Sequence, residues 1–151
     1  MSALRVPVPW VFVLVYLMGV ALETLLPLGF RETAPRATPL VGSVLFCLGA
    51  AIAGWGWMLF HKAGTTRVPG QASTTLVTSG PYRLTRNPMY VGLAIAYLGE
   101  AGILRHLWPV VLLPLIGAYL NWVVVPVEEA RLHEVFGSEY DTYRERVRRW
   151  I

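Results

Sequence analysis

Four apolar runs constrain the fold of this 151-residue chain more than any other feature of its sequence. A helix needs roughly 20 apolar residues to cross the hydrocarbon core of a bilayer, and only the third run is clearly shorter. Arg105-His106 alone separates the third run from the fourth, which predicts a tight helical hairpin. The sequence therefore predicts one all-α integral membrane domain over residues 1–151. The expected spans are residues 7–28, 39–60, 89–104 and 107–127.

The basic residues of the chain are distributed unevenly around the four expected spans. Ten of the thirteen Lys and Arg residues fall on the side that holds the N-terminus, the connector 61–88 and the C-terminal segment 128–151. The net charge of +4 would also suit a nucleic-acid-binding domain, but these residues lie between and after apolar runs, not on a polar face. We therefore expect a lipid bilayer as partner and no nucleic acid. Because cytoplasmic loops of membrane proteins are rich in Lys and Arg, we also expect both termini to be cytoplasmic. The three exceptions are Arg31, Arg36 and Arg105.

The connector 61–88 is polar, basic and rich in turns. It contains the turn dipeptides Gly80-Pro81 and Asn87-Pro88, since proline disfavours the helical conformation in the residue before it. Arg83 and Arg86 lie between these turns. A positive loop that merely orients the protein would explain the arginines alone. A second polar cluster at the same expected side, described next, favours a shared functional site.

The C-terminal segment begins with Glu128-Glu129 and then carries an apolar residue at every third or fourth position. This spacing predicts an amphipathic helical segment that lies on the membrane surface or folds over the site. Gly137 is expected to end a first helix, and Ser138 with Asp141 predicts a capping box that starts the next. The apolar stripe consists of Leu132, Phe136, Tyr140, Tyr143, Val147 and Trp150.

Several common chemistries lack their sequence pattern here. His61, His106 and His133 have no metal-ligand spacing, so no metal site is expected. Gly54-Trp55-Gly56 lacks the remaining glycine of a dinucleotide-binding fingerprint, and we interpret it as a helix-packing feature.

Together, the connector and the C-terminal segment resemble the signature of the isoprenylcysteine carboxyl methyltransferase and phospholipid methyltransferase superfamily. The connector part reads Leu-Val-Thr-Ser-Gly-Pro-Tyr over residues 76–82, then Arg-Asn-Pro-Met-Tyr over 86–90, then Gly92. The C-terminal part carries Glu128-Glu129, Leu132, Phe136-Gly137, Tyr140 and Tyr143. The resemblance covers residues 50–151.

This resemblance implies an enzyme that transfers a methyl group from S-adenosylmethionine to a lipophilic or membrane-embedded acceptor. It also implies a cytosolic cofactor pocket between the connector and the C-terminal segment. Arg86 and Glu129 are the expected catalytic residues. The expected cofactor-binding residues are Gly80, Tyr82, Arg86, Asn87, Pro88, Tyr90, Glu128 and Glu129.

The chemistry of S-adenosylmethionine agrees with these residue types. Carboxylates suit its ribose diol, its amine and its sulfonium, and an arginine can grip its carboxylate through two parallel hydrogen bonds. Methyl transfer is an in-line displacement, so most of the catalysis can come from positioning the two reactants.

Two residues depart from the prenylcysteine branch of the superfamily, which usually has a histidine at each position. Thr74 lies two residues before the Leu-Val-Thr element, and Asn87 precedes proline. A lipid amine or another small lipophilic acceptor is therefore favoured, with a prenylcysteine-type carboxyl O-methyltransferase as the alternative. A non-enzymatic membrane scaffold or subunit is the alternative from another class, and the oligomeric state stays open.

Three polar residues lie within the expected spans. Glu100 is either functional, as ionisable groups at membrane depth commonly are, or paired with Arg105 or His106 near the far interface. Glu23 is interpreted as structural. Asn121 is interpreted as an interhelical hydrogen-bonding residue.

Overall fold

The computed structural model describes residues 7–63 and 75–151, and this described part contains helices and turns but no strand. Arg5 and Arg67, two of the ten basic residues on the expected cytoplasmic side, and Thr74 lie outside the described residues. In chain order the elements are α1 (Val8–Leu25), α2 (Phe30–Thr33), α3 (Thr38–Lys62), η1 (Gly80–Arg83), α4 (Pro88–Leu104), α5 (Trp108–Tyr119), η2 (Leu120–Val124), α6 (Val125–Phe136) and α7 (Ser138–Arg146).

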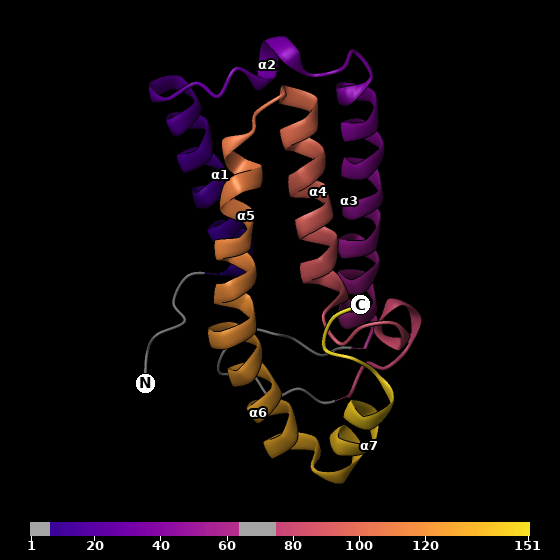
Figure 1. The fold of residues 1–151 in the computed structure, drawn as a ribbon. Coiled ribbons are helices and arrows are strands. Elements are labelled where there is room, and N and C mark those ends of the chain that lie inside the picture. Colours follow the sequence, from indigo (N-terminus) through magenta and orange to yellow (C-terminus); the bar gives the residue numbers. More distant parts are fainter. Residues whose placement is uncertain (1–6, 64–74) are drawn as a thin grey trace.

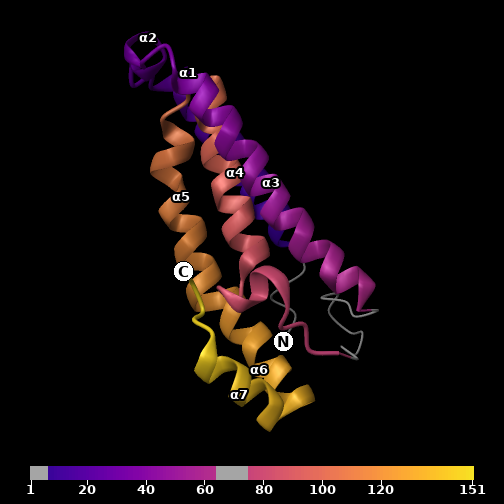
Figure 2. The same cartoon turned by 90° about the vertical axis from the view of Figure 1, so that its right-hand side faces the viewer.

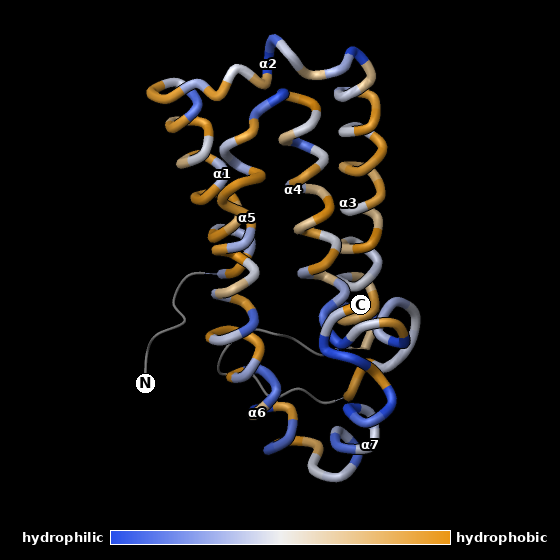
Figure 3. The backbone as a smooth tube through the Cα atoms, viewed as in Figure 1, coloured by the Kyte–Doolittle hydropathy of each residue, from blue (hydrophilic) through white to orange (hydrophobic). Residues whose placement is uncertain are grey.

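The long helices confirm the all-α integral membrane fold. Within the described residues, three helices can cross a membrane by length and composition: α1, α3 and the continuous helix Trp108–Phe136. The fourth, α4, has 17 residues and therefore rises only about 26 Å. As Figure 1 shows, α2 and the α4–α5 turn lie at one end of the bundle, while η1, α6 and α7 lie at the other. Hydrophilic residues gather at the end that holds α6 and α7 (Figure 3).

Glycines bring α3 and α4 into direct backbone contact. A Cβ atom at Gly49 would lie 2.3 Å from the backbone nitrogen of Ala96, and one at Gly99 would lie 2.3 Å from that of Phe46. Small residues permit this approach between membrane helices, whereas the large apolar side chains of α3 point outward. Gly56 faces Met89, as the packing interpretation predicted, but Gly54 faces open space.

Aromatic side chains join α4 to the other side of the bundle. The ring of Tyr97 packs edge-on against Phe12 and Tyr16 of α1, with ring centroids 6.0 and 5.2 Å apart. Ile116 and Leu120 complete the same buried cluster from the Trp108–Phe136 helix. The site end of α4 is thus held from both sides, by α3 and by this cluster.

The helix that begins at Trp108 does not end near Val127, as expected for a simple span, but continues to Phe136. It passes through a π-helical turn, η2, in which the N–H of Val125 donates to the carbonyl of Leu120. Pro126 follows this turn directly, and it lacks the N–H that would donate to the carbonyl of Trp122 in a regular helix. Glu128 and Glu129 therefore lie on a rigid extension of a membrane span.

Glu23 has the structural role predicted for it. One of its carboxylate oxygens accepts hydrogen bonds from the N–H groups of Leu107 and Trp108, at 3.2 and 3.3 Å. These groups belong to the first turn of α5, where backbone donors lack partners within the helix. The α4–α5 turn is as tight as predicted, with Arg105 in the left-handed conformation at φ 55°.

The C-terminal segment differs from the expectation in two ways. Gly137 does separate two helices, but the predicted capping box is wrong: α7 has no side-chain cap, and the Asp141 carboxylate instead contacts His133 Nδ1 at 3.1 Å. The predicted helical stripe is also too long, because α7 ends at Arg146 and Val147 is extended. The chain then turns back over the site, so that α6, α7 and the last residues lie beside the loop before α4 (Figure 2).

Candidate active site

The connector reaches the site through a 3₁₀ turn packed on the end of α3. Gly80 has φ +59°, a left-handed conformation that favours glycine, and a Cβ there would lie 2.8 Å from the end of the Leu59 side chain. The turn buries Tyr82, whose ring packs edge-on against Phe60 with centroids 5.3 Å apart. The hydroxyl of Tyr143 donates to the carbonyl of Tyr82 at 2.8 Å, which ties α7 to the connector.

A pocket opens where the connector, α6 and α7 meet. Its cavity volume is about 30 Å³, well below the roughly 300–1,000 Å³ of small-molecule sites, so a ligand of that size must displace part of the wall. The wall combines aromatic and aliphatic side chains with charged groups from both polar clusters. Its members are Phe60, Thr75, Leu76, Val77, Tyr82, Arg86, Asn87, Glu128, Glu129, Leu132, Tyr140 and Tyr143.

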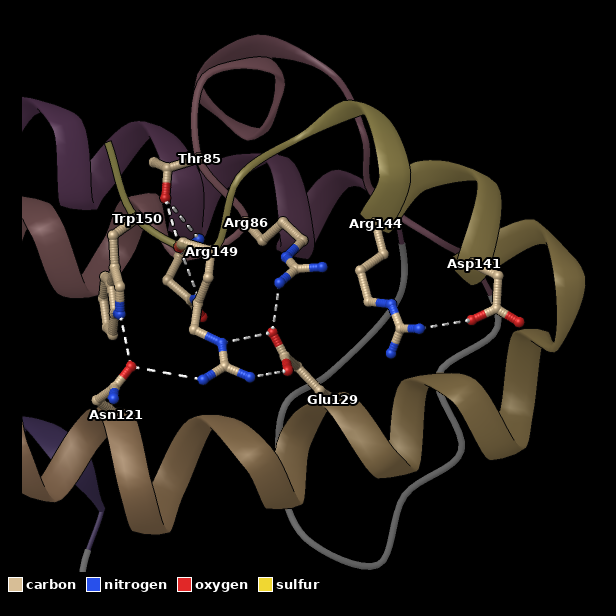
Figure 4. Close-up of polar contacts among 9 residues, drawn as sticks. Thr85, Arg86, Asn121, Glu129, Asp141, Arg144, Arg149 and Trp150 are labelled. Atoms are coloured by element: carbon tan, nitrogen blue, oxygen red, sulfur yellow. Dashed lines mark hydrogen bonds and ion pairs between the residues drawn. The ribbon is translucent and has the colours of Figure 1, made fainter.

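Glu129 joins the two polar clusters in a partly buried group of charges (Figure 4). Its Oε1 atom lies 2.9 Å from Arg86 Nη2, and the side chains of Arg86 and Glu129 are only 10% and 13% exposed. Arg149 approaches the same carboxylate side-on, with Nε 3.1 Å from Oε1 and Nη2 2.5 Å from Oε2. Removing one member of an ion pair this buried typically costs about 3–5 kcal/mol.

Arg86 retains unused donors at the pocket wall. Its Nε and Nη1 atoms are buried and have no hydrogen-bond partner among the described residues. A buried guanidinium without partners for these atoms is costly, and two guanidinium groups share the single carboxylate of Glu129. Arg86 therefore offers buried N–H donors at the pocket wall to an anionic group.

Tyr140 contributes a hydroxyl to the same wall. Its side chain is 1% exposed, and its oxygen has no partner in the described part of the chain. Burial, and then the nearby Glu129 carboxylate, raise the pKa of Tyr140 above its ordinary value, with the three arginines around it opposing. The hydroxyl therefore stays protonated at neutral pH and can donate a hydrogen bond.

Glu128 points to a different environment from its neighbour. Its Oε1 atom accepts a 2.6 Å hydrogen bond from the hydroxyl of Tyr90, and Tyr90 belongs to the buried cluster between α1, α4 and the Trp108–Phe136 helix. Glu129 therefore faces arginines, whereas Glu128 is linked to the apolar interior. The two neighbouring carboxylates therefore lie in different surroundings.

The last residues of the chain form a strap across the site, here defined as Arg148–Trp150. The backbone N–H of Arg86 donates to the carbonyl of Arg148 at 2.9 Å. The Thr85 hydroxyl and the Asn87 amide both donate to the carbonyl of Arg149, at 2.9 and 3.0 Å. The tail thus folds over the site, one of the two positions expected for it.

Of the eight sequence-predicted cofactor residues, the structure brings five together in the pocket wall and places three beside it. Pro88 is the first residue of α4, Gly80 packs on α3, and Tyr90 acts on the site through Glu128. Tyr82, Arg86, Asn87, Glu128 and Glu129 line the pocket.

Sequence reasoning missed the contribution of the strap. The sequence indicates Arg149 only as one of the basic residues of the expected cytoplasmic side, and Trp150 only as part of the helical stripe. Asn121 was expected to bond another helix, but its Oδ1 atom accepts from Trp150 Nε1 at 2.9 Å and Arg149 Nη1 at 3.5 Å. The available signal was a Trp-containing basic terminus directly after a charged helix.

Glu100 is exposed, and no ion pair within the described ranges joins it to Arg105 or His106. The paired alternative is therefore not found, and the functional alternative stays a prediction. The described residues also contain no cluster of three or more His, Cys, Asp or Glu side chains that could hold a metal ion.

Comparison with known proteins places this site in a family. A family model described as phospholipid methyltransferase matches residues 37–139, about two thirds of the chain. The chain belongs to the phospholipid methyltransferase family. The match spans α3, the connector, both glutamates and the start of α7, and it ends before Tyr140 and the strap. No curated protein and no solved structure matches the chain.

Membership in the phospholipid methyltransferase family confirms the resemblance drawn from the two sequence motifs. It identifies the chain with a family of methyltransferases that act on lipids. The apolar helices agree with a membrane location for such an enzyme.

Proposed function

We propose that this protein transfers a methyl group from S-adenosylmethionine to a lipophilic acceptor, favouring a lipid amine, at the pocket between the connector and α6. The observation that carries the proposal is the buried guanidinium of Arg86, whose Nε and Nη1 atoms lack partners in the described structure. A carboxylate satisfies such donors through charge-assisted hydrogen bonds. S-adenosylmethionine, the methyl donor that the family implies, carries such a carboxylate.

The other wall residues fit the remaining parts of the cofactor. Glu129 offers an acceptor to ribose hydroxyls or to an amine, and Tyr140 offers a donor from its protonated hydroxyl. Phe60, Val77 and Leu132 provide apolar surface for an adenine ring. The bound cofactor would supply an electrophilic methyl group, which bonds to the acceptor lone pair as the carbon–sulfur bond breaks.

Glu128 is assigned to the acceptor side of the pocket. Its hydrogen bond from Tyr90 links it to the buried membrane cluster, the direction from which a lipid would approach. An acceptor amine carries a proton near neutral pH and must lose it before it attacks the methyl group. We propose that Glu128 holds the ammonium form and accepts this proton, directly or through water.

The proposed orientation places this pocket in the cytoplasm, where S-adenosylmethionine is available. Eight of the described Lys and Arg residues lie at the pocket end of the bundle and three at the other, and the excess of positive charge favours the cytoplasmic side. Accessibility of single cysteines placed in α2 and in α7 to an impermeant thiol reagent, in intact cells, tests this orientation.

The direct test of the function is transfer of a labelled methyl group by purified protein in lipid vesicles. Phosphatidylethanolamine and a prenylcysteine mimic are offered separately as acceptors. Label in the amino lipid alone supports the proposal. Label in the prenylcysteine mimic alone would favour carboxyl O-methylation, and failure to bind S-adenosylhomocysteine would favour a non-enzymatic scaffold.

A further inference from the structure

The strap Arg148–Trp150 is held in place by contacts that do not involve the side chain of Arg149. Its backbone carbonyls accept three hydrogen bonds from the connector, and the donors Thr85 and Asn87 are only 3% and 4% exposed. Trp150 adds a side-chain bond to Asn121. Because buried polar groups need partners, Thr85 and Asn87 fix the position of Arg149.

The π-helical turn supplies the other side of this arrangement. In a regular α-helix, residues eight apart are rotated by about 80°, so Asn121 and Glu129 would face different directions. One extra residue in the π turn sets the rotation back by roughly 100° and brings both residues toward the strap. Arg149 accordingly contacts Asn121 and Glu129 at once.

Arg149 holds Glu129 without entering the pocket. Glu129 and Arg86 line the pocket wall, whereas Arg149 does not. Arg149 makes two contacts through Nε and Nη2, compared with the single contact from Arg86 Nη2. A two-point contact from a planar guanidinium fixes the orientation of a carboxylate as well as its charge.

We propose that Arg149 is a positioning residue of the methyltransferase site, which acts by holding the Glu129 carboxylate in the orientation that contacts the cofactor. This inference rests on the proposed function and names a residue beyond the segment that matches the family model. It also assigns Thr85 and Asn87 a different task from ligand binding, namely anchoring the strap that carries Arg149. The hydrogen bond to Glu129 raises the pKa of Arg149, so the guanidinium is charged at neutral pH.

The test is calorimetric binding of S-adenosylhomocysteine to the full-length protein in lipid nanodiscs. Arg149→Gln removes both the positive charge and the two-point contact with Glu129. Arg149→Lys keeps the charge and the backbone contacts of the strap but removes the two-point contact. We expect Kd to rise about 30-fold and about 10-fold, respectively, because the two-point contact is lost. Arg148→Gln is the matched control, since that side chain is exposed, and its Kd should stay within about twofold.

A double-mutant cycle separates positioning from a general structural role. In the Glu129→Gln background, Arg149→Lys should raise Kd by less than about threefold, because residues that act through one another are not additive. Equal losses in both backgrounds, or Arg149 variants that bind as wild type does, would overturn the inference alone. Wild-type protein that fails to bind would overturn the proposed function, and the inference with it.

Discussion

Gly49→Ala tests whether backbone contact between α3 and α4 builds the site. The added Cβ would lie 2.3 Å from Ala96 N and 2.5 Å from the carbonyl oxygen of Gly92. Ordinary contact begins near 3.4 Å, so the helices must separate by about 1 Å in a region packed to interior density. The atoms that clash belong to the backbone and cannot rotate away. Overpacking of this kind costs about 1–3 kcal/mol, and we expect the upper part of that range.

This separation should reach the pocket because its wall uses both helices. Phe60 lies near the end of α3, and Asn87 immediately precedes α4. An error of about 1 Å in a binding site can cost up to about 100-fold. We therefore expect an apparent Tm lower by roughly 5–10 °C and a Kd for S-adenosylhomocysteine at least about tenfold higher.

The matched control is Gly54→Ala, five residues further along the same helix. A Cβ at Gly54 meets nothing within 4 Å, and alanine favours a helix over glycine by about 1 kcal/mol. Thermal unfolding should show an unchanged or higher Tm for this variant. Gly49→Ala protein with the Tm and the Kd of Gly54→Ala would refute the close approach of α3 and α4.

Three further substitutions probe separate contacts. Glu23→Ala should lower the free energy of unfolding by about 1–2 kcal/mol, because it removes the acceptor for the first turn of α5. It should leave S-adenosylhomocysteine binding at the opposite end unchanged, and a higher Kd would contradict this. Tyr90→Phe should lower methyl transfer more than cofactor binding, since its hydroxyl contacts Glu128; a loss confined to cofactor binding would contradict the acceptor assignment. The raised pKa of Tyr140 means that the unfolded chain releases this proton first as pH rises through about 10. Stability should therefore fall above that pH in thermal unfolding, and less steeply in Tyr140→Phe; equal slopes would show that Tyr140 does not contribute.

The helices of the bundle were predictable from local sequence because each depends on the length of its own apolar run. The predicted start of the third span, for example, differs from the start of α4 by one residue. The continuation of the last span through residue 127 was not predictable from hydropathy. The helix passes through a π turn and then Pro126 without ending.

The positions of the tail residues depend on contacts distant in sequence. Trp150 continues the three-to-four-residue spacing of a helix, yet it lies in the strap because Asn121 and the connector offer hydrogen-bond partners there. Asp141 has the spacing of a capping box, but His133 competes for its carboxylate. Local patterns predicted that Arg86 and Glu129 share a site, and the structure brings them together, whereas the contact of Arg149 with Glu129 requires three segments distant in sequence.

The central claim is that the two polar clusters form one pocket for the methyl donor. The most direct measurement is calorimetric binding of S-adenosylhomocysteine to purified protein with Arg86→Ala and Glu129→Ala. The controls are Arg83→Ala in the same connector and Glu134→Ala in the same helix, since both side chains are exposed. We expect micromolar binding (Kd roughly 1–100 μM, about −8.2 to −5.5 kcal/mol) by wild type and both controls, and its loss in both site variants. Wild-type binding that survives both site substitutions, or no binding by folded wild type, would contradict it.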